Sequence, residues 1–398
     1  MVSRLGLADL LSASTSGGAS CLTAVTDLAP AVGAHASVAP AKFASRVSPQ
    51  GTYAYETRYD KGVARDVVLI DSKQSQLNRV EEALSAAIVD GHETLVRVPR
   101  MVVSYESAEY TDLDLPHRAF DGHFRAGFID GKPATQNDSY RRIRDANPGN
   151  ALALLENSPA SLVFGAWDSS RAARQGRWRS ILVGEIIGFC EAPSGLPELK
   201  GGARVDPHGM QVQLTGAALK ALAERQREEL SKKTFDKVVK AAKGEKLVSA
   251  SAVGLGGIPP SLETLAGVAC ESITRSHVLS FAALRQIRFG KGPEGDSACR
   301  ALLAALALAG LARSDAELVL RANCDLVEAG PTRVVQHERA GQSREFASLS
   351  VEDADALLAA ALDHAERTAE VVWDGVTLRF EGDPAIGAGA VDDESNGE

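Results

Sequence analysis

The sequence has few aromatic residues and few cysteines, and these shortages exclude several classes of protein. Phe, Trp and Tyr make up 5% of 398 residues, so the core must consist mainly of Ala, Leu and Val. The five cysteines form no C-x-x-C pair, which indicates neither a zinc site nor a disulfide framework. We therefore expect no metal, no cofactor and a reducing, cytoplasmic location. These cysteines are Cys21, Cys190, Cys270, Cys299 and Cys324.

Long hydrophobic runs and catalytic signatures are also missing. No run approaches the roughly 18 apolar residues that predict a membrane span, and Asp9 interrupts the apolar N-terminal stretch before it reaches signal-peptide length. Gly254–Ser261 (GLGGIPPS) has two prolines where a phosphate-binding helix would begin, so a rigid turn is expected there. The absence of a nucleotide loop, metal cluster and nucleophile elbow disfavours a metabolic enzyme.

Net charge is −9, which argues against RNA binding because phosphate contacts need Lys and Arg. The acids are unevenly distributed, since residues 381–398 carry six acids and no base and leave −3 on the rest. Residues 115–180 have ten bases against six acids, and residues 220–246 have nine against five. Such local basic strips are compatible with a phosphate backbone as ligand.

The order of predicted elements is mixed, without regular β-α-β alternation, and favours an α+β fold with insertions. Strands are predicted at 66–70, 94–104, 161–167, 181–189, 317–321 and 376–380, and helices at 77–88, 216–246, 297–312 and 351–365. We expect a partly ordered segment at 1–60 and a core at 61–380. The core holds insertions at about 105–150 and 216–246, the latter being charged, and residues 381–398 form an acidic disordered tail.

Asp71–Arg79 (DSKQSQLNR) lies between a predicted strand and a predicted helix. Helix capping accounts for Asp71, Ser72 and Ser75. It does not account for five further polar residues gathered where a helix N-terminus favours phosphate. RNA contact is the preferred interpretation of these five, and a solvated first turn is the alternative. They are Lys73, Gln74, Gln76, Asn78 and Arg79.

The insertion at 105–150 combines basic residues with aromatic rings, as a grip on single-stranded nucleic acid requires. Contact with single-stranded RNA is the preferred interpretation, and a polar surface loop whose aromatic residues only hold it to the core is the alternative. The basic residues are His117, Arg118, Arg125, Lys132, Arg141, Arg142 and Arg144, and the rings are Phe120, Phe124, Phe128 and Tyr140.

A second basic segment, Arg171–Arg179 (RAARQGRWR), places four arginines beside a tryptophan, and arginine matches phosphate oxygens in two-point contacts. We expect contact with RNA or a neighbouring subunit there. Basic residues further along the chain are candidates for the same RNA contact. Simple exposure to solvent explains them equally well. The residues are Arg171, Arg174, Arg177, Trp178 and Arg179, and downstream Arg285, Arg288 and Lys291.

Several segments together resemble the type I-G (formerly I-U) CRISPR-associated RAMP proteins, the Cas-seven group that forms the backbone of the Cascade surveillance complex. The resemblance spans roughly residues 60–380. It rests on DSKQSQLNR with the following VEEAL, and on LPHRAF, FIDGK, SLVFGAWDS, GIPPS and LSFAALRQIRF, at 71–84, 115–120, 128–132, 161–169, 257–261 and 279–289.

The resemblance implies an RRM-like, ferredoxin-type core and a non-catalytic subunit that binds crRNA and polymerises head to tail in a helical filament. Implied partners are copies of itself, a five-type subunit with a guide-processing domain, a large Cascade subunit and a recruited helicase-nuclease. Target DNA would be recognised through guide pairing. The resemblance also implies a protruding thumb hairpin, for which the insertion at about 105–150 is the candidate, either as the hairpin or as its base. No membrane is implied.

Related type III backbone subunits cut target RNA with a loop aspartate, so an RNA-guided ribonuclease is the alternative function. Asp71, Asp121, Asp130 and Asp168 are the aspartates that would be proposed. An aspartate at a strand end more often fixes a turn, and nothing in the spacing of these residues requires catalysis.

Overall fold

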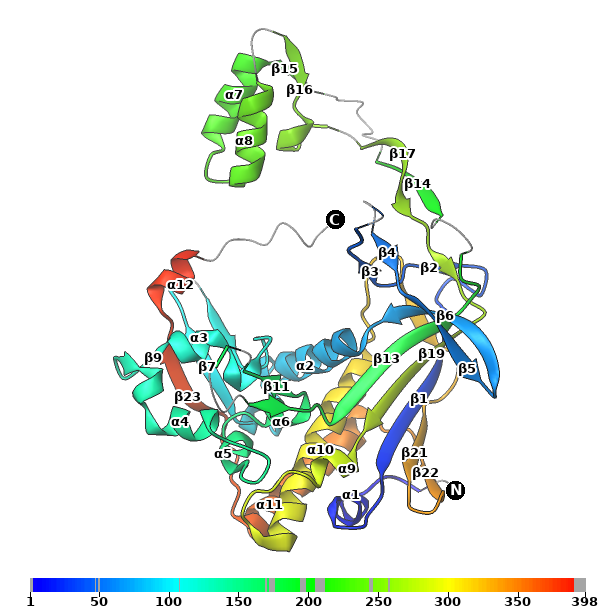
Figure 1. Ribbon diagram of the computed structural model, residues 1–398, viewed down its shortest axis with the longest axis vertical. Coiled ribbons are helices and arrows are strands. Elements are labelled where there is room, and N and C mark those ends of the chain that lie inside the picture. Colours follow the sequence, from blue (N-terminus) through cyan, green and yellow to red (C-terminus); the bar gives the residue numbers. More distant parts are fainter. Residues whose placement is uncertain are drawn as a thin grey trace. The chain divides into compact units, whose positions relative to one another are not determined.

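The computed structural model describes residues 3–46, 48, 51–106, 108–168, 170–171, 176–193, 198–204, 212–242, 246–256 and 258–389 (Figure 1). The chain divides into two compact units. The larger comprises Met1–Ala41, Ala54–Ala192 and Val268–Glu398, and the smaller comprises Lys42–Tyr53 and Pro193–Gly267. Each unit is described by itself.

An antiparallel sheet organises the larger unit, in the order β22-β21-β1-β19-β13-β6-β5, with β20 also paired to β1. Its strands are β1 (Cys21–Pro30), β5 (Tyr55–Asp60), β6 (Val63–Asp71), β13 (Leu182–Phe189), β19 (Ser272–Leu279), β20 (Leu326–Glu328), β21 (Arg333–His337) and β22 (Ser343–Phe346).

Two helices complete a β-α-β-β-α-β succession within this sheet. Along the chain come β1, α2 (Lys73–Val89), β13, β19, α10 (Gly292–Ala316) and β21, and the four strands lie side by side as β21-β1-β19-β13. The β5-β6 hairpin extends one side and β22 the other. Helices and antiparallel sheet together confirm the predicted α+β class.

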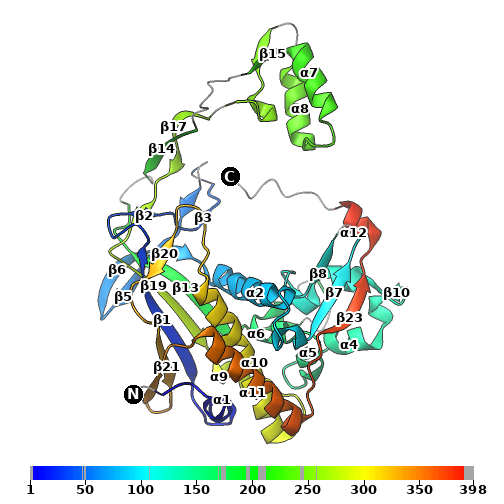
Figure 2. The same ribbon diagram turned by 180° about the vertical axis from the view of Figure 1, so that it is seen from behind.

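The core lies on one face of the sheet, beneath α2, α10 and α11 (Val351–Ala369) (Figures 1 and 2). Residues of β19 alternate between buried and half-buried, as expected for a strand with one covered face. Helix α10 crosses α2 closely, since a Cβ at Gly310 would lie 2.7 Å from Val80 Cγ1 and 2.9 Å from Leu84 Cγ. Only glycine permits this approach.

Helix α10 is long and apolar enough to cross a membrane by length and composition, but its apolar stretch is fully buried within the protein. Its Ala- and Leu-rich surface packs against other helices nearly all round. A core helix in this position needs no polar face.

A second sheet, of order β10-β9-β23-β7-β8, receives the 105–150 insertion. The insertion is not a protruding hairpin, because its rings enter the core: Phe120, Phe124 and Tyr140 are buried, with Phe124 and Tyr140 against Phe380 of β23. The elements are β7 (Arg100–Ser104), β8 (Glu109–Thr111), η2 (Arg118–Phe120), α3 (Gly122–Ala126), β9 (Phe128–Ile129), β10 (Lys132–Pro133), η3 (Ala134–Gln136), α4 (Asp138–Arg144) and β23 (Val376–Glu381).

Several helices and strands differ from those that the sequence predicted. Residues 161–167, predicted as a strand, begin inside α6 (Pro159–Val163), where Pro159 occupies the first helical turn. No strand forms at 317–321, and the next strand is β20. Central strand β1 was not predicted, because its apolar and small polar residues do not alternate regularly. Helix α12 (Pro384–Gly389) lies inside the segment expected to be disordered, whereas residues 390–398 lie outside the described ones.

Short elements complete the larger unit. They are α1 (Leu7–Ser14), β2 (Ser37–Val38), η1 (Leu95–Arg97), α5 (Leu152–Leu155), β11 (Ala166–Trp167), β12 (Arg177–Trp178), β18 (Val268–Ala269) and α9 (Phe281–Leu284).

The smaller unit holds the predicted charged helical insertion as two helices around a small core of Leu219, Ala223, Val238 and Ala250. Pro259 and Pro260, expected in a rigid turn, lie in β17, which pairs only with β14 and so tolerates proline. The elements are β3 (Lys42–Phe43), β4 (Thr52–Tyr53), β14 (Leu199–Arg204), β15 (Gln213–Thr215), α7 (Gly216–Arg225), α8 (Lys232–Ala241), β16 (Leu247–Ser249), η4 (Ser251–Val253) and β17 (Ile258–Leu265).

Candidate nucleic-acid interface

The β11-β12 hairpin brings two of the predicted basic segments together. Ala166 pairs with Trp178, and Trp167 pairs with Arg177. The hairpin rests on the insertion, because Gly176 lies so close to Phe120 that a Cβ there would be 3.0 Å from the ring. Arginines of 117–144 and of 171–179 therefore share one region of the surface, which we call the arginine surface: Arg125, Arg144, Arg171, Arg177 and Arg179.

The outward-facing tryptophan of the hairpin is not the one that the sequence suggested. Trp178, a predicted RNA contact, is 8% exposed and lies in the core, whereas Trp167 is 46% exposed. Cross-strand partners share a face and successive residues alternate, so Trp167 and Arg177 face outward together. Which tryptophan faces outward is determined by the pairing of β11 with β12, which the sequence alone does not give.

Arg177 stacks on the exposed indole, with its guanidinium carbon 5.1 Å from the centre of the Trp167 ring. A cation over a ring is a modest attraction at an exposed site. Arg179, two residues on, is exposed as well. The hairpin thus combines a flat apolar surface with cationic donors, the pairing that binds a base and its phosphate.

Arg125 reaches the hairpin from α3. Its Nη1 donates to Ser170 Oγ at 2.7 Å and lies 3.2 Å from the buried Asp168 Oδ1. Burial raises the pKa of Tyr140 to about 12. The charge of Arg125 opposes this shift, and that of Asp168 adds to it. The tyrosine therefore stays neutral beneath the surface.

A carboxylate of the same surface joins two further arginines. Asp145 accepts from Arg144 Nη2 at 2.8 Å and from Arg171 Nη2 at 2.6 Å, and Arg171 Nη1 also donates to the Arg144 carbonyl at 3.0 Å. The Arg144 hydrogen bond and then that of Arg171 lower the pKa of Asp145 to about 2. The Asp145 carboxylate is 36% exposed, whereas Arg144 and Arg171 are 24% and 18% exposed.

Arg118 holds the hairpin to α2. It forms a two-point ion pair with Glu81 of α2, and its Nη1 donates to the Gly165 carbonyl at 2.7 Å. Burial raises the pKa of Glu81 even though the Arg118 hydrogen bonds oppose it. With its guanidinium held by these partners, Arg118 positions the hairpin, which differs from its predicted contact with RNA.

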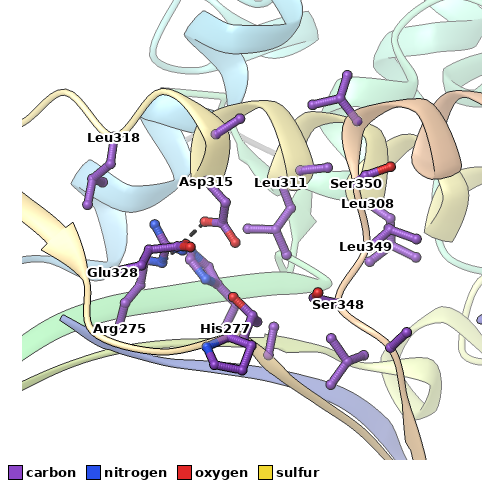
Figure 3. A pocket seen from close by; sticks show the side chains of 18 of the residues that line it. Arg275, His277, Leu308, Leu311, Asp315, Leu318, Glu328, Ser348, Leu349 and Ser350 are labelled. Carbon is purple, nitrogen blue, oxygen red and sulfur yellow. Dashed lines mark hydrogen bonds and ion pairs between the residues drawn. The ribbon is translucent and has the colours of Figure 1, made fainter. Parts of the chain in front are cut away.

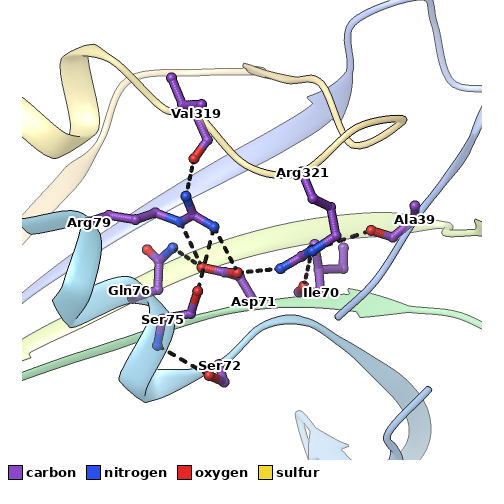
Figure 4. A network of polar contacts seen from close by, with 9 residues as sticks. All are labelled: Ala39, Ile70, Asp71, Ser72, Ser75, Gln76, Arg79, Val319 and Arg321. Carbon is purple, nitrogen blue, oxygen red and sulfur yellow. Dashed lines mark hydrogen bonds and ion pairs between the residues drawn. The ribbon is translucent and has the colours of Figure 1, made fainter. Parts of the chain in front are cut away.

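The predicted cluster at the start of α2 divides into exposed residues and internal ones, and Figure 4 shows the contacts of the internal Gln76 and Arg79. Gln76 Nε2 donates to the buried Asp71 Oδ2 at 2.6 Å, and Arg79 Nε does so at 3.1 Å. Arg321, not singled out in the sequence, donates to Asp71 Oδ1 at 2.6 Å and to the Ile70 carbonyl at 2.7 Å.

Gln76 and Arg79 thus direct their hydrogen bonds at partners inside the protein. This differs from their predicted contact with RNA. Burial alone would raise the pKa of Asp71, but hydrogen bonds from Arg79 and Gln76, with the charges of Arg79 and Arg321, lower it. Ser72 caps α2 by accepting from the Ser75 amide at 3.2 Å, as predicted. The three exposed members of the cluster are Lys73, Gln74 and Asn78.

The other predicted residues are spread over the larger unit. Arg141 donates to the Thr135 carbonyl at 2.8 Å. Arg285 donates to backbone carbonyls of Ala13 and Ala19, so it supports the fold. Exposed or half-exposed side chains are His117, Lys132, Arg142, Arg288 and Lys291, and Arg174 lies outside the described residues.

The four aspartates weighed for catalysis have diverse surroundings. Asp71 and Asp168 pair with arginines, and Asp121 caps α3 by accepting from the His123 amide at 3.1 Å. Asp130 is exposed in a turn, with φ of 50°. Within the described part of the chain, no group of three or more His, Cys, Asp or Glu side chains is placed to hold a metal ion.

Comparison with known proteins gives one family. No curated protein matches the chain. Residues 22–191, from β1 through β13, match the model of the family described as CRISPR-associated protein GSU0053. The matched segment includes the β11-β12 hairpin, Arg118, Asp71 and Arg79, whereas Arg321 lies outside it. Over this part of its length, the chain is similar to a CRISPR-associated protein family, which indicates a protein of a CRISPR system.

Proposed function

We propose that this chain is the crRNA-binding backbone subunit of a type I-G CRISPR Cascade complex and acts without catalysis of its own. The family match supports the CRISPR context. The observation that carries RNA binding is the outward-facing pair of Trp167 and Arg177, with Arg179 beside it. A ring that accepts any base, together with donors for phosphate, suits a guide whose sequence varies.

The strand order supports an RRM-like core. The β-α-β-β-α-β succession and the order β21-β1-β19-β13 agree with the split βαβ arrangement of that fold. Such a core with its insertions would polymerise head to tail along the spacer through heterologous contacts.

The remaining partners belong to the same proposal. They are a five-type subunit with a guide-processing domain, a large Cascade subunit, target DNA recognised through guide pairing, and a recruited helicase-nuclease, all in the cytoplasm. Pairing would supply sequence recognition, which leaves the protein to recognise backbone and shape.

The aspartate contacts support a non-catalytic role. Asp71, Asp121 and Asp168 accept hydrogen bonds or ion pairs that maintain the fold. A general acid or base needs to reach the scissile phosphate, and these three carboxylates are buried.

The test is expression with a CRISPR array, followed by extraction of the nucleic acid that copurifies. Discrete guide-length RNA is expected with the native chain. Arg177→Glu combined with Arg179→Glu should deplete that RNA and lower the salt slope of binding by about 1 for each lost phosphate contact. Arg367→Glu with Arg379→Glu makes the same charge change at exposed sites on α11 and β23 and should leave the RNA in place. Nucleic-acid-free native protein would overturn the proposal.

A further inference from the structure

A cavity of about 890 Å³ lies in the larger unit, between the sheet and the helices that cover it (Figure 3). Side chains of β19 form one wall, Leu308 and Leu311 of α10 face them, and the segment Ala347–Glu352 contributes to the lining. Most of the lining is Leu, Ala and Val. This volume and composition are those of sites for small molecules.

Arg275 is the first of two buried polar side chains on the β19 wall, and it is 1% exposed. Its Nη2 donates to Glu328 Oε1 at 2.9 Å and to Thr26 Oγ1 at 3.3 Å. Its Nε lies 3.3 Å from Asp315 Oδ1 without hydrogen-bond geometry. Its Nη1 has no hydrogen-bond partner among the described residues.

His277, two residues along the same face of β19, is 2% exposed. Its ring lies over Gly184 of β13, where a Cβ would come within 2.4 Å of Nε2. Burial and then the Arg275 charge lower the pKa of His277 to about 3, so the ring is neutral. Nε2 finds no partner within the described chain.

Buried nitrogens without hydrogen-bond partners each cost about 1–3 kcal/mol unless something binds them, and within the described residues Arg275 and His277 both carry such nitrogens. The cavity that these two side chains line has room for much more than a single water molecule, which takes about 30 Å³ of liquid volume. A hydrogen-bond acceptor bound in the cavity is the kind of partner that the two side chains lack.

The charges beside Arg275 favour an uncharged acceptor. Asp315 and Glu328 already lie against the guanidinium, so an added anion would meet two carboxylates for one cation. Burial raises the pKa of Asp315 to about 6, with the charge of Arg275 opposing the shift and that of Glu328 adding to it. A cationic ligand would be repelled by the positive charge of Arg275.

We propose that this cavity binds a small uncharged molecule, with an apolar body between β19 and α10 and a carbonyl oxygen that accepts hydrogen bonds from Arg275 and His277. The site involves none of the residues of the arginine surface. It therefore stands independently of the RNA-binding proposal.

The test uses N-hexylacetamide, which joins an amide carbonyl to an apolar tail, and full-length protein labelled with ¹⁵N-histidine. We expect a saturable shift of the His277 ring signals, which His277→Gln identifies among the eight histidines. Hexanoate and hexylammonium, of similar length but charged, should bind more weakly. No saturable shift, or hexanoate binding as tightly as the amide, would overturn the proposal.

A blocking variant tests the location of binding. Ala316 lines the cavity at the end of α10 and is exposed, so Ala316→Trp fills the entrance without entering the core. It should raise the Kd of the amide about tenfold or more. Ala282→Trp makes the same change at an exposed site on α9 outside the lining and should leave the Kd unchanged. An unchanged Kd in Ala316→Trp would contradict binding in this cavity.

Discussion

Asp71 and Asp145 each join two arginines, yet they belong to opposite kinds of region. Asp71 is completely buried between Arg79 and Arg321, whereas Asp145 is 36% exposed between Arg144 and Arg171. The arginines themselves are buried to similar extents, since Arg79 and Arg321 are 19% and 29% exposed and Arg144 and Arg171 are 24% and 18% exposed. The two regions therefore differ in the burial of the carboxylate, which decides how much stability its loss costs.

The largest effect should come from the buried member of this pair. Asp71→Ala leaves Arg79, Arg321 and Gln76 without their shared acceptor. Breaking a buried ion pair in this way should lower the free energy of unfolding by about 3–5 kcal/mol. Urea denaturation measures the loss.

Asp145→Ala is the matched control, since it also removes a carboxylate between two arginines. Exposed pairs contribute about 0–1 kcal/mol, so its loss should stay within that range. Equal losses in the two variants would contradict the distinction between the regions.

Asp112 is a third carboxylate to compare with Asp71 and Asp145, because it is buried and has no arginine as a hydrogen-bond partner among the described residues. Burial raises the pKa of Asp112 to about 7, against hydrogen bonds from Ser158 and the Met101 amide. Between about pH 4 and 7 the folded state holds a proton that the unfolded chain has released. The free energy of unfolding should therefore fall as pH rises through that window, by up to about 1.4 kcal/mol per pH unit.

Asp112→Asn removes this titration and keeps the hydrogen-bonding shape. Denaturation curves recorded across the pH window should have a shallower pH slope in the variant. Identical slopes in variant and native protein would show that Asp112 does not carry the effect.

The exposed ring should affect RNA binding and not stability. Trp167→Ala should weaken binding of single-stranded RNA by about 1–3 kcal/mol, the contribution of one stacked base. Trp178→Phe changes the buried ring of the same hairpin and should leave RNA affinity unchanged. Fluorescence anisotropy with a labelled guide measures both, and the reverse order of effects would assign the wrong tryptophan to the interface.

The sequence predicted those elements that have strong apolar patterns. Strand β6, helix α2, strand β13 and helix α11 were all expected near their observed bounds, because local periodicity determines them. Central strand β1 was missed, since its place in the sheet depends on pairing with β19 and β21 from the other end of the chain. Such partners leave no local signal.

The sequence predicted which basic segments form the candidate site, but not which of their side chains face solvent. The structure joins the basic segments 117–144 and 171–179, while Gln76, Arg79 and Arg118 have internal partners. The partner of Arg118 is Glu81, and Arg321, which lies in none of the quoted motifs, binds Asp71 beside Arg79. Hydrogen-bond partners far apart in sequence, and the choice between Trp167 and Trp178, depend on the fold around them.

The close crossing at Gly310 sets the spacing between α10 and α2, and so the position of everything that α2 carries. Val80 and Leu84 touch the crossing, while their neighbour Glu81 holds Arg118 and, through it, the β11-β12 hairpin. The absence of a side chain at Gly310, in the apolar core, thus helps to determine the position of Trp167 on the surface. Efforts to stabilise this protein by replacing core glycines would, at this position, change the geometry of its surface.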